Sequence, residues 1–345
     1  MTGRSAALQG GLALAGLIVA NFTWQREPER APGEVTVIDA SKADVSRLLY
    51  EDADGILGVE RRTEGGEAVA WVHIEPKAKP TAAAAAGQSD PAAPPKTPEA
   101  PPRELRGNAD ALRLADRFAP LVSPRAFGVI TGDKLKELGL DAPKRHLELV
   151  VRGDTRKYEV GIALNAQNGE AFLRDDRDGR VYLMPRGLLI DLGNGKRLVD
   201  SRLHTFDTKE FDRIAISGGD KHKEFLHVGR DNFSTEGYVP PKAPDKRDLM
   251  AKNWAEMVWR LFPMEVLGKD ELPKGGTLKP LLRVEYSEKG NPVGWIDIAR
   301  FEGTTAESGD EPDRLYARSE HTVGWARLHA TDQLISDGEK LLAAP

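Results

Sequence analysis

"SKADVSRLLY" at residues 41–50 returns in altered form as "DTKEFDRIAI" at residues 207–216. Each copy passes from a polar start through an acidic residue, an apolar residue and an arginine into a short apolar run. The paired positions are Asp44 with Glu210, Val45 with Phe211, Ser46 with Asp212, and Arg47 with Arg213. A stretch that is used twice indicates two copies of one supersecondary unit.

The order of the expected elements around the two stretches is also repeated. Residues 35–76 have the composition of strands, with the turn signals "DADG" and "EGGE" between them. A helical pattern follows in each copy, at 108–124 and at 246–263, and each ends near a proline. Four strand-like segments then follow each helix: 145–151, 156–162, 170–175 and 180–185 in the first copy, and 281–287, 294–300, 314–319 and 323–328 in the second. We predict an α+β fold in which a single N-terminal transmembrane helix precedes two tandem modules of mostly antiparallel sheet, each with a covering helix.

The predicted transmembrane helix is the stretch "AALQGGLALAGLIVANFTW" at residues 6–24, which has no charged side chain. At about 1.5 Å of rise per residue, a helix of this length nearly crosses a hydrocarbon core of about 30 Å. The anchoring residues would be Leu12, Leu14, Leu17, Ile18, Val19 and, at the interface, Trp24. A cleaved signal peptide is the competing interpretation, although the small residues of a good cleavage site are poorly placed here.

The domain boundaries follow from the repeat. Residues 1–30 are assigned to the anchor, 31–200 to the first module and 201–345 to the second. The tract at 77–102 is rich in alanine and proline and cannot bury a core. The offset between the copies is larger for the first strands than for the helices, so we place this tract as an insertion within the first module.

Composition excludes several classes of function. The net charge is -5 and the pI about 5.9, so the chain has no general attraction to nucleic acid. There is no cysteine, which rules out thiolate nucleophiles, cysteine-ligated zinc and disulfides. An oxidising compartment outside the cytoplasm fits this absence.

One group of motifs resembles a known family. The segments are "LGLDAP" at 138–143, "VG" at 160–161, "AFLRD" at 171–175 and "VYLMP" at 181–185. In this order they resemble an uncharacterised family of membrane-anchored, repeat-containing bacterial proteins. Its members are encoded beside ABC transporters of the gliding-motility type, next to a permease and an auxiliary subunit. The resemblance implies an accessory role at the outer face of a transport or motility complex, and it identifies no active site.

Motifs that suggest chemistry have simpler structural explanations. The five-residue spacing of His222 and His227 does not form a metal site, and a solvent-exposed hairpin explains the pair better. "RDDRDGR" at 174–180 lacks the ligand pattern of a calcium loop and reads as a hairpin turn. We therefore predict no catalytic, cofactor-binding or metal-binding residues. Trp254 lies on the apolar stripe of its helix and is predicted to be a core residue. Trp259 lies nearer the flank and is a candidate partner-binding residue, with core packing as the alternative.

These observations predict a non-enzymatic accessory or scaffold subunit of a cell-envelope ABC transporter or motility complex. The expected partners are the transporter permease, other envelope proteins and the lipid bilayer, without nucleic acid, nucleotide or cofactor. The expected location is the bacterial inner membrane, with one pass and most of the chain in the periplasm. A ligand-binding receptor with a site between the modules is the alternative, and an envelope hydrolase with paired carboxylates is a third possibility.

Overall fold

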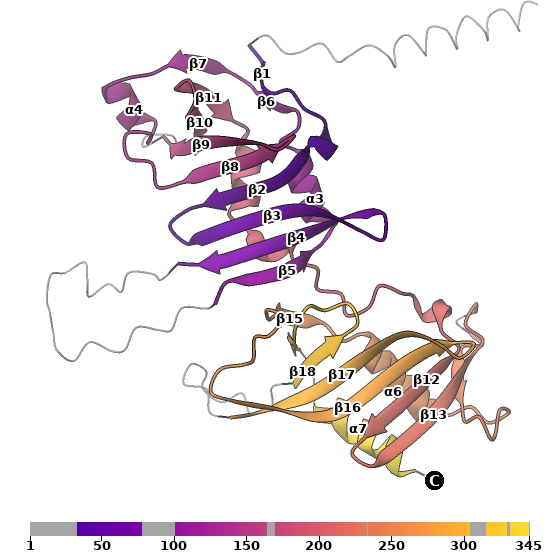
Figure 1. Ribbon diagram of the computed structural model, residues 1–345. Coiled ribbons are helices and arrows are strands. Elements are labelled where there is room, and N and C mark those ends of the chain that lie inside the picture. Colours follow the sequence, from indigo (N-terminus) through magenta and orange to yellow (C-terminus); the bar gives the residue numbers. More distant parts are fainter. Residues whose placement is uncertain are drawn as a thin grey trace, which may run out of the picture.

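The computed structural model describes residues 33–77, 101–163, 170–232, 234–303, 315–329 and 332–344. Strands take up 46% of these residues and helices 19%, and the strands form three sheets (Figure 1). The predicted α+β class is therefore wrong, because sheet dominates both halves of the molecule. Helical patterns of 17 to 18 residues in the sequence yield helices of only 8 and 11 residues, whereas two strands reach 13 residues.

The first large sheet has nine strands in the order β5-β4-β3-β2-β8-β9-β10-β11-β7, and all of its pairings are antiparallel. Its strands are β2 (Val45–Glu51), β3 (Gly55–Glu64), β4 (Glu67–Pro76), β5 (Arg103–Gly107), β7 (Ala126–Val129), β8 (His146–Val151), β9 (Asp154–Ile162), β10 (Ala171–Asp175) and β11 (Arg180–Met184). A separate two-stranded sheet joins β1 (Val35–Ile38) to β6 (Leu121–Ser123).

The second large sheet has eight antiparallel strands in the order β14-β13-β12-β16-β17-β18-β19-β15. Its strands are β12 (Arg213–Gly218), β13 (Lys221–Val228), β14 (Gly237–Val239), β15 (Pro263–Val266), β16 (Gly276–Glu288), β17 (Asn291–Gly303), β18 (Leu315–Ser319) and β19 (Ala326–Leu328). This order equals that of the first sheet without β5, with β12 in the place of β2. The two large sheets therefore share one topology.

The repeated stretch of sequence takes the same structure in both sheets. A short 3-10 helix, η1 (Lys42–Asp44) or η3 (Thr208–Glu210), leads into the inner strand β2 or β12. Asp44 accepts a hydrogen bond from the backbone N–H of Ser41 at 2.8 Å, and Glu210 accepts one from that of Asp207 at 2.9 Å. Each acidic side chain thus closes a capping box, which explains why both copies carry a carboxylate at this position.

Each large sheet is covered by two helices rather than by the single helix predicted. The helices are α3 (Ala109–Asp116), α4 (Asp133–Glu137), α5 (Arg186–Leu192), α6 (Leu249–Trp259) and α7 (Asp332–Ala343), with a further 3-10 helix η2 (Gly195–Leu198). α3 and α5 contribute to the core of the first sheet, and α6 and α7 lie behind the second sheet and contribute to its core (Figure 1). α5 and α7 were not predicted, because the prediction relied on the helical pattern that occurs once in each copy of the repeat, and that pattern corresponds to α3 and α6.

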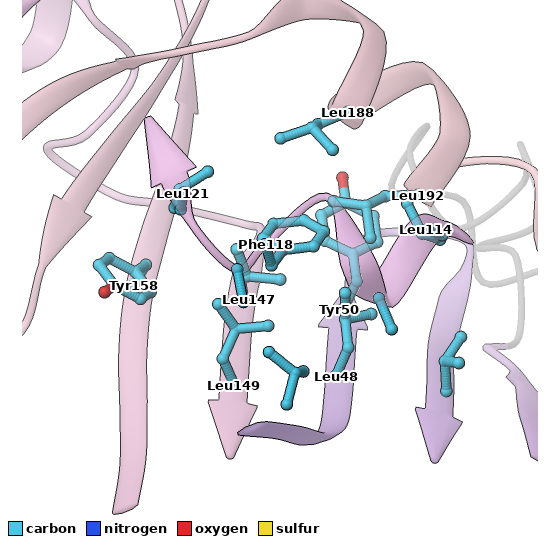
Figure 2. Close-up of a cluster of buried hydrophobic side chains, with 14 of the residues drawn as sticks. Leu48, Tyr50, Leu114, Phe118, Leu121, Leu147, Leu149, Tyr158, Leu188 and Leu192 are labelled. Carbon is cyan, nitrogen blue, oxygen red and sulfur yellow. The ribbon is translucent and has the colours of Figure 1, made fainter. Parts of the chain in front are cut away.

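The first core shows how these layers meet. Figure 2 shows side chains from the sheet facing those of the helices, labelled Leu48, Tyr50, Leu114, Phe118, Leu121, Leu147, Leu149, Tyr158, Leu188 and Leu192. Leu48 and Leu149 are opposite one another on β2 and β8 and are fully buried. Because strand side chains alternate between faces, this pair fixes which face of the sheet receives the helices.

The membrane prediction concerns residues outside the described part of the chain. The stretch 6–24 is not described, and its six proposed anchoring side chains, Leu12, Leu14, Leu17, Ile18, Val19 and Trp24, belong to it. The same holds for residues 78–100 of the Ala/Pro tract. Among the helices that are described, none combines the length and the apolar character needed to cross a bilayer.

An arginine clamp connects the two halves of the molecule. Arg103 on β5 donates two hydrogen bonds of 2.7 Å to the carboxylate of Glu271 and one of 2.7 Å to Glu265 on β15. Beside it, Leu105 packs against Val266 and Ala326 of the second sheet. Arg103 and Glu271 are largely buried, and bidentate arginine–carboxylate pairs are among the stronger polar contacts.

Candidate functional site

A hollow of about 350 Å³ lies between α6 and the end of the second sheet where η3 leads into β12. Its inner surface is aromatic and aliphatic, made by Phe211, Ile214, Tyr238, Trp254, Ala255, Val258, Trp259, Val284 and Tyr286. Its rim is polar and charged, made by Asp207, Thr208, Glu236, Lys252, Glu256 and Arg260. This size and this combination of an apolar interior with a few polar groups are typical of ligand-binding sites.

The register of the second sheet explains why these rings meet. Ile214 of β12 is paired with Phe225 of β13 on one side and with Tyr286 of β16 on the other. Residues opposite one another in an antiparallel ladder share a face, and this face is covered by α6. Burial raises the pKa of Tyr238 and of Tyr286 well above the ordinary value, so both rings remain neutral phenols.

Trp259, the predicted partner-binding residue, lies half-buried at the end of α6. One face of its indole stacks on His204, with ring centroids 5.1 Å apart and the planes within 11°. Phe206 and Tyr286 meet it edge to face at 5.5 and 5.9 Å. Trp259 is therefore held firmly by its neighbours and also lines the hollow. Its role in binding stays a prediction.

Trp254, predicted to be a core residue, is only 1% exposed. Its indole N–H donates a 2.8 Å hydrogen bond to the carbonyl oxygen of Leu334 on α7. The ring thus forms the deep wall of the hollow and ties the two helices of the second sheet together.

His227 lies on β13 and is buried, in contrast to the exposed hairpin position expected from the sequence. Its ring stacks between Phe211 and Tyr238, at centroid distances of 4.9 and 4.7 Å. Its Nε2 lies 2.9 Å from a carboxylate oxygen of Glu236. Burial lowers the pKa of His227 below its ordinary value, so the imidazole is neutral at neutral pH and does not cancel the negative charge of Glu236. His222, five residues earlier, is exposed as predicted.

The charges on the rim are unevenly balanced. Glu256 is flanked on its own helix by Lys252 at 3.9 Å and Arg260 at 3.4 Å. Asp207 accepts hydrogen bonds from the backbone N–H of Lys209 at 3.2 Å and from the Thr208 hydroxyl at 3.1 Å. Within the described ranges, no lysine or arginine forms an ion pair with Asp207 or with Glu236. The lining carries three carboxylates and two basic groups, which leaves an excess of negative charge.

The equivalent place in the first sheet is closed by an ion pair. Matching the ladders through Leu48 and Ile214 puts Arg61 of β3 in the place of His227. Counting from the helix caps Asn108 and Asp248 puts Asp116 of α3 in the place of Glu256. The guanidinium of Arg61 donates a hydrogen bond to Asp116, and both side chains are largely buried, 19% and 25% exposed. In the first module, therefore, the Arg61 side chain fills the space that is open in the second module.

A serine, a histidine and an aspartate meet where the two modules join, but they do not form a catalytic triad. His321 Nε2 lies 3.0 Å from Asp200 Oδ2, and both residues are 7% exposed. The Ser319 hydroxyl donates its hydrogen bond to the Leu203 carbonyl, so no base is placed to activate it. Burial by itself would raise the pKa of the Asp200 carboxyl, but hydrogen bonds from His321 and Arg202 bring that pKa well below its usual range.

The other sequence motifs resolve into turns. "RDDRDGR" is the turn between β10 and β11, as predicted, with Gly179 in the left-handed region at φ 70°. In the part of the chain that is described, no group of three or more histidine, aspartate or glutamate side chains is arranged to hold a metal ion. A second hollow of about 270 Å³ lies beside α3 and α5 in the first module. Neither hollow is lined by residues of both modules.

Comparison with known proteins adds nothing to this geometry. A scan of protein-family models found no match, and searches of curated proteins and of solved structures found none either.

Proposed function

We propose that this chain is a non-enzymatic accessory or scaffold protein that binds a partner protein at the aromatic hollow of its second module. The observation that carries this proposal is the difference between the two copies. One topology is closed by Arg61 and Asp116 in the first module and opens to solvent at the same place in the second. Tryptophan and tyrosine on the inner surface of a concave site, with polar groups around its rim, are typical of binding hot spots.

The arrangement around the hollow supports a scaffold role. Trp259 is stacked on His204, so little side-chain entropy is lost when a partner covers it. The Arg103 clamp and the buried Asp200–His321 pair hold the second module against the first. A partner seated in the hollow is thereby placed at a fixed position relative to the first module.

The partner and the location come from the sequence. The motif resemblance at 138–185 supports a transporter permease or another envelope protein as the partner. The uncharged stretch at 6–24 and the absence of cysteine support a position at the outer face of the bacterial inner membrane. Protease protection tests the location. We expect a protease to digest residues 201–345 when it reaches the outer face of the inner membrane. Digestion only when the protease reaches the cytoplasmic face would overturn this location.

Site-specific photo-crosslinking tests the binding function. A photoreactive residue at Thr208, on the rim, is expected to crosslink one envelope protein in cells, and Trp259→Ala is expected to abolish that product. The matched control carries the photoreactive residue at Leu272, which is 60% exposed and does not line the hollow. Equal crosslinking from both positions, or a product unaffected by Trp259→Ala, would contradict binding at the hollow.

A further inference from the structure

The first module shows which chemical group fits the space between the sheet and the end of its helix, the place of the hollow in the second module. Arg61 points from β3 toward the helix, on the same face as the buried Val59, and its guanidinium meets the carboxylate of Asp116 at the end of α3. The residue opposite Arg61 on β4 is the small Ala70. A planar cation and a helix-borne carboxylate thus fill the space between this sheet and its helix.

The second module keeps the carboxylate on its helix and has no cationic side chain at the strand position that Arg61 occupies in the first. Glu256 stands in the place of Asp116, while the shorter His227 stands in the place of Arg61 and turns to Glu236. Tyr238, paired with His227 on β14, replaces Ala70 and adds an aromatic surface. Guanidinium groups stack on aromatic rings and bind carboxylates in a planar fork, so these replacements offer both types of contact to a guest.

The charges favour a cationic guest as well. Among the described residues, no lysine or arginine forms an ion pair with Asp207 or Glu236, and the partner of Glu236 is the His227 imidazole at 2.9 Å. The contacts of Glu256 with Lys252 and Arg260, at 3.9 and 3.4 Å, are longer than the 2.7–2.9 Å of a strong charge-assisted hydrogen bond. A guest that carries a positive charge therefore meets three carboxylates on the rim, of which only Glu256 is paired with lysine or arginine, and aromatic rings inside.

We infer that the hollow of the second module binds an arginine side chain of the partner protein, in the place that Arg61 fills in the first module. This inference rests on the proposed function and adds the chemistry of the contact. The planar guanidinium is favoured over the ammonium of lysine, because it stacks on rings and loses less hydration when it is buried.

Small probes test the chemistry without the partner. The full chain is titrated with ethylguanidinium, ethylammonium and ethylurea at equal ionic strength, and tryptophan fluorescence and calorimetry report binding. Ethylguanidinium is expected to bind about tenfold more tightly than the neutral ethylurea, because only the cation gains cation–π and carboxylate contacts, which are of this magnitude. Equal affinity for ethylguanidinium and ethylurea, or tighter binding of ethylammonium, would overturn the inference.

A substitution that supplies the missing cation from within provides the second test. His227→Arg is expected to abolish ethylguanidinium binding and the crosslink from Thr208, with unfolding measured to show that the variant is folded. Glu236→Gln, which keeps the shape of the side chain, is expected to weaken the binding of ethylguanidinium by several fold. If the wild-type chain crosslinks a partner and His227→Arg crosslinks it equally well, the arginine inference fails and the binding function stands. If the wild-type chain crosslinks no partner from Thr208, the binding function fails and the arginine inference fails with it.

Discussion

The two modules have the same strand order apart from the additional β5 of the first, and they differ in the side chains between the sheet and its helices. In the first, Leu48 and Leu149 form a compact aliphatic pair. In the second, the same ladder positions hold Ile214 and Tyr286. The comparison shows that a repeated ladder of backbone hydrogen bonds fixes topology, while the side chains on its inner face decide whether the space closes or remains open.

The largest loss of stability is expected when the buried residue at the equivalent position of α6 or α3 is truncated. Trp254→Ala should lower the free energy of unfolding by about 3–5 kcal/mol, because it removes a fully buried ring and leaves the Leu334 carbonyl without its donor. Leu114→Ala, at the equivalent position of α3, should cost about 2–5 kcal/mol. Urea denaturation measures both. A loss below about 1 kcal/mol for Trp254→Ala would show that the ring is not a structural wall of the hollow.

The connection between the modules should give the next largest effect. Asp200→Ala leaves the Nε2 atom of buried His321 without its partner and should lower the free energy of unfolding by about 1–3 kcal/mol. Because the pair lies where the modules meet, the variant should also separate their unfolding into two transitions. Calorimetry of the wild type and the variant measures this, and an unchanged single transition at the wild-type temperature would contradict the assigned role.

The ion pair that closes the first module should contribute less. Arg61→Ala should lower the free energy of unfolding by about 1 kcal/mol, since the pair is largely buried. Ethylguanidinium should restore part of this loss by entering the vacated space. Arg113→Ala is the matched control, because its pair with Asp110 on α3 is mostly exposed and should contribute close to nothing. Equal losses in the two variants, without rescue, would show that Arg61 does not close the module.

The smallest effect is a dependence on pH. Burial holds the native pKa of His227 below its ordinary value of 6.5, so the unfolded chain takes up the proton at a higher pH than the native chain does. Stability from this residue is therefore complete above about pH 6.5 and falls as the pH drops toward the native pKa. His227→Gln should flatten the pH dependence in this window, and the exposed His222→Gln should leave it unchanged. Identical profiles for wild type and His227→Gln would indicate an exposed or already charged ring.

The parts of the fold that depend on local pattern can be predicted from the sequence. The pairing of Asp44 with Glu210 pointed to two equivalent starts of strands, and both carboxylates close capping boxes. Trp254 was correctly placed in the core from its position on the helical stripe. Such features depend on residues within a few positions of one another, which the sequence displays directly.

The overall class and the candidate site depend on distant residues, and there the sequence was less informative. The α+β prediction gave too much weight to two amphipathic helices and overlooked how many short strands the chain contains. Arg61 meets Asp116 across 55 positions, and Arg103 meets Glu271 across 168. The correspondence between Arg61 and His227 appears only when the registers of β3 and β13 are known.

Hydrogen–deuterium exchange with and without ethylguanidinium tests the central contrast most directly. In the wild-type chain, we predict added protection in residues 207–214 and in α6, and none in α3. In the doubly substituted chain, with Arg61→Ala and His227→Arg, we predict that the protection moves to α3 and β3. Two results would contradict the claim that the first module contains its own cation and the second binds one from outside. One is protection that stays in the second module of the doubly substituted chain, and the other is protection in neither module of the wild-type chain.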